Sequence, residues 1–124
     1  MAIVEWQAWC KAEDLAVDGD VVEGTGGRSR KHRITVEDCG DALRLTGVVV
    51  GSRRSDQDGL EVEVWQRNRR LMLVGMRFDK QDRLIGESWA PKAGLVQDEF
   101  LLYLRTLARE CDRYEFQLTG QDRL

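Results

Sequence analysis

The last quarter of the chain carries a regular apolar pattern that limits what the rest can fold into. Its apolar residues recur at alternating steps of four and three: Phe100, Leu104, Leu107, Cys111, Tyr114 and Leu118. This spacing predicts one amphipathic helix over residues 95–120, with charged side chains such as Arg105 and Asp112 on the other side. Such a helix needs a sheet or a partner to cover its apolar stripe. We therefore expect the preceding residues to provide a sheet.

Between residues 30 and 89 the apolar pattern changes to a period of two, which is typical of β-strands. We predict five strands: residues 30–36, 42–50, a segment that begins at 60, 71–78 and 83–89. Short, turn-forming connections between them favour antiparallel pairing. A first helix is predicted over residues 2–16 and a Gly-rich loop over 21–29. The expected fold class is α+β, a five-stranded antiparallel meander with a helix at each end, in a single domain over residues 1–124.

The third predicted strand has one apolar and one acidic side. Leu60, Val62 and Val64 alternate with Glu61 and Glu63, so we expect one side to be buried and the other to face water. Two carboxylates on one strand face can support acid–base chemistry. Without a second pair or a predicted pocket, a solvated edge explains them better.

The composition indicates a folded protein outside the membrane. The chain has 124 residues, of which 42% are hydrophobic and 33% charged, and it contains one proline and four tryptophans. The longest apolar runs are too short to span a bilayer, and the start lacks the pattern of a secretory signal. We expect a cytoplasmic protein with no membrane partner.

The fourth predicted strand is apolar on both faces. Leu71 and Leu73 point one way, while Met72, Val74, Met76 and Phe78 point the other. Two helices can cover one face of a sheet and a margin of the second, so the remaining apolar face needs a further cover. Met72, Val74, Met76 and Phe78 are therefore predicted to form a partner or dimer surface. A second subunit, a client protein or a small apolar ligand would satisfy it.

The basic residues are clustered although the net charge is −3. One cluster lies within residues 28–33, and Arg67, Arg69 and Arg70 form another close to Trp65. These side chains are candidates for contacts to an anion, RNA or single-stranded DNA through phosphate binding and stacking. The negative net charge and the lack of an RNA-binding aromatic pattern make nucleic acid the less favoured partner.

No residue pattern predicts a catalytic, metal or cofactor site. The single histidine, His32, lies in a basic segment without evident partners, and we predict that it is on the surface. Residues 24–27 lack the helix that a phosphate-binding loop requires, and residues 56–59 lack most ligands of a calcium loop. Cys10, Cys39 and Cys111 form no metal-binding spacing. We expect a protein that is not an enzyme and has no cofactor.

Several segments of the C-terminal part resemble one known family. They are RLIGE at 83–87, PKAGL at 91–95, the acidic helix start, residues 104–112, and a CDR.E..LTG.D pattern that begins at Cys111. They are similar to YbjN-like proteins, above all to small cyanobacterial members, over residues 30–124. That family shares the fold of type III secretion chaperones. The resemblance implies an α–β5–α domain that is usually dimeric and has no catalytic residues, while chaperones of this fold hold an unfolded segment of a client.

The expected function is therefore non-catalytic protein binding of a chaperone or adaptor kind, by a homodimer with an unknown client. A nucleic-acid-associated regulator that uses the Arg-rich loops is one alternative. A carrier of a small apolar ligand is the other.

Overall fold

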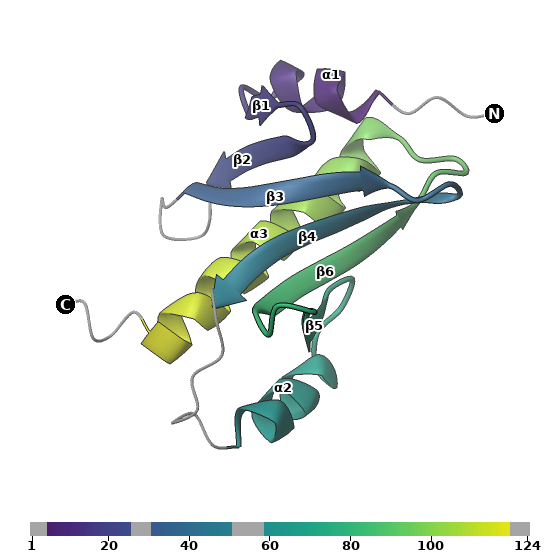
Figure 1. Ribbon diagram of the computed structural model, residues 1–124. Helices are drawn as coiled ribbons and strands as arrows, with labels where there is room; N and C mark the ends of the chain where they lie inside the picture. Colours follow the sequence, from purple (N-terminus) through teal and green to yellow (C-terminus); the bar gives the residue numbers. More distant parts are fainter. Residues whose placement is uncertain (1–4, 26–30, 51–58, 120–124) are drawn as a thin grey trace.

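The computed structural model describes residues 5–25, 31–50 and 59–119, which form one antiparallel sheet and three helices (Figure 1). In chain order the elements are α1 (Trp6–Ala12), β1 (Ala16–Asp18), β2 (Val21–Thr25), β3 (Lys31–Asp38), β4 (Ala42–Val50), α2 (Leu60–Asn68), β5 (Gly75–Phe78), β6 (Leu84–Pro91) and α3 (Gln97–Thr119). The strands follow the order β1-β2-β3-β4-β6-β5, and every neighbouring pair is antiparallel. The predicted α+β class, with a helix before and after an antiparallel sheet, is confirmed.

Helix α3 covers one face of the sheet, and its apolar stripe forms the core. It crosses diagonally behind the strands in Figure 1 and packs on β2, β3, β4 and β6. The first five residues of the predicted stripe are buried and Leu118 is half-buried. Helix α1 packs on α3, with the ring centres of Trp6 and Trp9 at 6.0 and 5.8 Å from that of Phe100. The predicted final helix is thus confirmed to within two residues at its start.

Two glycines at the centre of the sheet allow α3 to approach closely. Gly47 in β4 and Gly86 in β6 are direct partners in the register. A Cβ atom on Gly86 would lie 2.5 Å from the Sγ of Cys111, and one on Gly47 would lie 3.2 Å from the same sulfur. The missing side chains therefore let the middle of α3 rest against the strand backbones.

The predicted strand that begins at residue 60 is wrong, because this segment is helix α2. Its alternating pattern is short, and a short apolar run fits a strand or a helix equally well. A helix places Val62 and Val64 on different sides, and their exposure differs accordingly: Val64 is 5% exposed, whereas Val62 is 59% exposed. Glu61 and Glu63 lie in the first turn, where a helix favours negative charge.

The sheet also differs from a simple meander, and it has six strands instead of five. Two of them, β1 and β2, form a hairpin where the sequence predicted the end of the first helix and part of a loop. Of the predicted strand 71–78, only Gly75–Phe78 is β5. The predicted pairing of β5 with β6 is present, but β6 also pairs with β4, so that β5 lies at the edge of the sheet. The predicted turn at 55–58 and loop residues 26–29 lie outside the described residues.

Among the helices of the described residues, none is both long enough and apolar enough to cross a membrane.

Candidate protein-binding surface

Helix α2 is fixed to the outer edge of β5 by the side chain of Asn68. The Nδ2 group of Asn68 donates a hydrogen bond to the carbonyl oxygen of Met76 at 2.8 Å, and the Met76 amide donates to Asn68 Oδ1 at 2.7 Å. The side-chain amide thus takes the place of a neighbouring strand. It satisfies backbone groups that an edge strand would otherwise expose.

A second contact joins the end of α2 to α3. The guanidinium of Arg67 lies 3.9 Å from the ring centre of Tyr114, and it also donates a hydrogen bond to Gln117. With Val64 buried between α2 and the sheet edge, these contacts set which side of α2 faces inward. The opposite side is left to the solvent.

The outward side of α2 and the segment after it expose four large apolar side chains. Val62 is 59% exposed, Trp65 60%, Met72 79% and Leu73 43%. We call these four residues the α2 surface. Single exposed apolar residues are common, but a group this dense within residues 62–73 is typical of a contact surface. The guanidinium of Arg69 lies 5.2 Å from the Trp65 ring centre and borders this group.

The backbone after α2 is held in an unfavourable conformation that keeps Leu73 exposed. Leu73 has a φ of 70°, a left-handed value that a leucine rarely adopts. The hydroxyl of Ser88, which is buried, donates a hydrogen bond of 2.5 Å to the Leu73 carbonyl oxygen. The structure therefore maintains this segment despite its conformational cost.

The four residues predicted as a partner surface do not lie on one surface. Val74 and Met76 are 7% and 3% exposed and belong to the core, and Phe78 is half-buried against it. A Cβ atom on Gly86 would lie 3.3 Å from the Met76 sulfur, so Met76 faces the sheet centre under α3. Met72 alone of the four is exposed. The face expected to need a partner is covered within the protomer because α2 and α3 close over it.

The predicted basic cluster divides in the same way. Arg67 is half-buried and its guanidinium contacts Tyr114 and Gln117, whereas Arg69 and Arg70 are exposed. In the other basic cluster, Arg33 is exposed and residues 28–30 lie outside the described residues. Of the predicted contact residues Arg67, Arg69 and Arg70, the last two are thus exposed to solvent.

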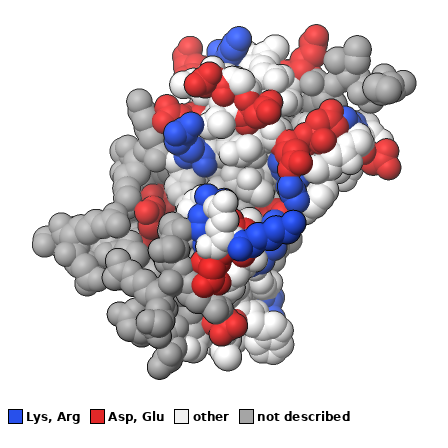
Figure 2. Space-filling model, viewed as in Figure 1, with Lys and Arg blue, Asp and Glu red and all other residues white. Residues whose placement is uncertain are grey.

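The face of the sheet opposite α3 is polar and rich in ion pairs. Figure 2, drawn from the same side as Figure 1, shows acidic and basic side chains interspersed over it. Arg77 pairs with Glu87 at 3.0 Å and Arg83 with Asp79 at 2.8 Å. A hollow of about 560 Å³ on this side is lined partly by Arg33, Asp79 and Arg83. Its charged lining is poorly suited to a small apolar ligand.

The buried cysteines are structural. Burial raises the pKa of the Cys111 thiol to about 12 and that of Cys10 to about 11. Both are free thiols that stay protonated near neutral pH, so neither is an activated nucleophile.

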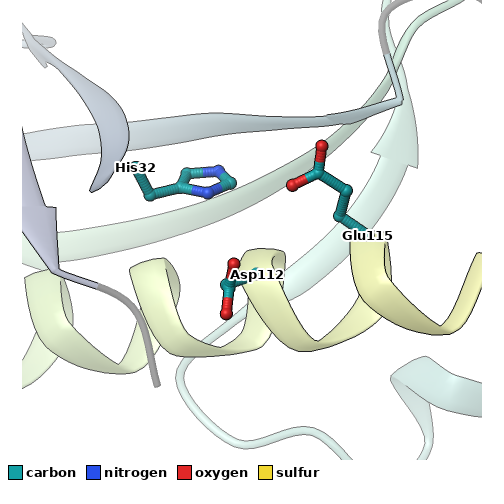
Figure 3. A group of neighbouring side chains, drawn as sticks. All are labelled: His32, Asp112 and Glu115. Atoms are coloured by element: carbon teal, nitrogen blue, oxygen red, sulfur yellow. The ribbon is translucent and has the colours of Figure 1, made fainter. Parts of the chain in front are cut away.

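Two polar residues were placed wrongly by the sequence. His32, predicted on the surface, is 8% exposed, and Asp112, predicted on the charged side of α3, is 2% exposed. The signal for His32 was present in the sequence, since the alternation that directs Ile34 and Val36 inward also directs His32 inward. Together with Glu115 they form a group of side chains shown in Figure 3.

Neither a protein-family model nor a curated protein sequence matches this chain. Solved structures do resemble it. The ExoU–SpcU heterodimeric complex from the type III secretion system of Pseudomonas aeruginosa contains a chain with a TM-score of 0.65 and 12% identity, over 87% of this chain and 93% of that one. A chain of the HopA1–SchA chaperone–effector complex gives a TM-score of 0.60 and 10% identity, over 89% of each chain.

A chain of the ExsC–ExsE complex gives a TM-score of 0.61 and 15% identity, over 89% of this chain and 87% of that one. At such low identity these matches establish the fold and not a shared activity. The protein thus has a type III secretion chaperone-like fold.

Proposed function

We propose that this protein is a non-catalytic protein-binding module of a chaperone or adaptor kind. The observation that carries the proposal is the α2 surface, where four large apolar side chains are exposed beside a firmly anchored helix. Solved structures of the same fold, described as a chaperone–effector complex and as a heterodimeric complex of a secretion system, support the same class of function. The identity of the client lies beyond this proposal.

The first occupant that we propose for the α2 surface is a second copy of this chain. Val62 and Trp65 are one helical turn apart on the same side of α2, so two copies related by a twofold axis can oppose these side chains directly. Met72 and Leu73, which follow α2 in the chain, are exposed as well and add apolar area to what a specific interface of roughly 1,000 Å² requires. Since β5 is already paired with the Asn68 side chain on its outer edge, the contact would form through side chains and not by strand addition.

Three further parts of the proposal rest on the sequence. Membership of the YbjN-like family rests on the C-terminal motifs, and the cytoplasmic location rests on composition. We also propose that the protein is not an enzyme and that it binds protein without a cofactor. This part rests on the missing catalytic motifs.

The test of the proposed function compares two variants that carry the same change on different surfaces. Trp65→Asp alters the α2 surface, whereas Leu102→Asp alters an equally exposed apolar residue on the outer side of α3. We expect wild-type protein and Leu102→Asp to retain the same partner protein from the native cell, and Trp65→Asp to lose it. The partner, once purified, should reconstitute the complex at a fixed ratio. A complex that tolerates Trp65→Asp would contradict the assignment of this surface.

The nucleic-acid alternative makes a distinct prediction about salt. Arg69 and Arg70 are exposed and can reach phosphates, but Arg67 is engaged within the protomer. We expect no appreciable binding to RNA or single-stranded DNA at physiological salt in a fluorescence anisotropy titration. A micromolar complex that weakens steeply with salt and disappears when Arg69 and Arg70 are both replaced by Glu would favour the alternative, because phosphate contacts release counterions.

A further inference from the structure

Three potential metal ligands meet between the sheet and α3. His32 lies near the start of β3 on its inward side, and Asp112 and Glu115 are three residues apart on α3. This separation places both carboxylates on the same side of the helix. The ligand atoms of the three side chains all lie within 4.8 Å of one another. Figure 3 shows the Glu115 carboxylate pointing toward the imidazole ring, with Asp112 on the adjacent turn.

His32 is largely buried beside the two carboxylates. The residue is 8% exposed, and its ligand atom lies within 4.8 Å of those of Asp112 and Glu115. Buried polar groups are normally satisfied by a partner, since removing them from water without one has a substantial energetic cost. A bound ion would be such a partner for the imidazole nitrogen.

The geometry suits a small divalent ion. Imidazole nitrogen and carboxylate oxygen bind Zn²⁺ at about 2.0–2.2 Å, so two ligand atoms of one ion are at most about 4.4 Å apart. In the structure the ligand atoms lie within 4.8 Å of one another, so small side-chain rotations would bring them to the distances that one ion requires.

Two of the three ligands line a hollow. The hollow of about 560 Å³ described above has His32 and Glu115 in its lining, whereas Asp112 is not part of it. Glu115 is half-buried and Asp112 is 2% exposed. An ion in the hollow can thus contact His32 and Glu115 first.

We infer that His32, Asp112 and Glu115 form a binding site for a divalent transition-metal ion of the Zn²⁺ type. The ion joins β3 to α3 and leaves at least one coordination position for water. This site is independent of the α2 surface and of protein binding there. The sequence had predicted no metal site, because it placed His32 on the surface and Asp112 on the charged side of the helix.

The test uses untagged, metal-free protein in which the exposed Cys39 is replaced by Ser, so that no accessible thiol competes for the ion. Calorimetric titration with ZnCl₂ should show one ion per chain. His32 is the only histidine, so its two ring nitrogens are assigned without ambiguity in a ¹⁵N NMR spectrum. Zinc should shift the resonance of one of them, and zinc at about 100 times its dissociation constant should raise Tm by roughly 10 °C.

Two conservative variants separate the site from general electrostatics. Glu115→Gln, a conservative change at a half-buried position, should weaken zinc binding more than about 100-fold, since even groups beyond the ligands change affinity about 10- to 100-fold. Glu110→Gln removes a buried charge from the same helix that pairs with Arg109 and Arg113, and it should leave binding unchanged. Equal weakening by both variants, no one-to-one binding, or an unshifted His32 spectrum with zinc present would overturn the inference.

Discussion

Replacing Met76 by aspartate is expected to unfold the protomer. Met76 is 3% exposed and faces the sheet centre beneath α3, with its backbone bonded to Asn68 on one side and paired with Gly86 on the other. The change removes a buried side chain, which costs about 2–5 kcal/mol, and it places a carboxylate in an apolar site. The sum is comparable with the whole stability of a domain of this size, about 5–15 kcal/mol. Circular dichroism should show loss of the folded signal at 25 °C.

Met72→Asp is the matched control for this prediction. The same substitution is made four residues earlier, at a methionine that is 79% exposed. Surface changes usually alter stability by less than about 0.5 kcal/mol, so the thermal unfolding curve should be almost unchanged. A stable, folded Met76→Asp protein would show that Met76 is not part of the core and would revive the partner surface predicted from the sequence.

Truncating Leu104 to alanine is expected to destabilise the protein by about 2–5 kcal/mol, because the change leaves a cavity where α3 meets the sheet. Leu104 is 2% exposed and belongs to the central core. Leu102→Ala, two positions away on the same helix, truncates a leucine that is 55% exposed. Chemical denaturation should show a large loss for Leu104→Ala and a small one for Leu102→Ala. Similar losses of stability in both variants would mean that α3 does not pack the side that carries Leu104 against the sheet.

The long final helix was predictable because its apolar pattern, from Phe100 to Leu118, repeats over about five turns and leaves one consistent interpretation. The antiparallel sheet followed from short connections between apolar segments. Helix α2 could not be predicted in the same way, because Leu60, Val62 and Val64 fit an alternating strand as well as one helical turn. Its identity is determined by tertiary contacts, namely the Asn68 bonds to Met76 and the position of Arg67 over Tyr114.

The same error displaced the predicted binding surface. With α2 read as a strand, nothing remained to cover Val74 and Met76, and a partner was invoked for them. Once α2 covers the edge of β5, the uncovered apolar residues are those on its own outer side, Val62 and Trp65, with Met72 after it. The cluster of His32, Asp112 and Glu115 was missed for a different reason: its members come from β3 and α3, and only the fold brings them together.

Sedimentation equilibrium at micromolar protein concentration tests the central claim that the α2 surface binds protein, and a second copy first of all. Wild-type protein and Leu102→Asp should both have twice the mass of the chain, and Trp65→Asp should have the mass of one chain with its thermal stability as a protomer retained. Trp65 is 60% exposed in the single protomer, so its replacement removes apolar contact area without opening the core. A wild-type protein that is a monomer at every concentration, or a dimer that Trp65→Asp leaves intact, would contradict the account.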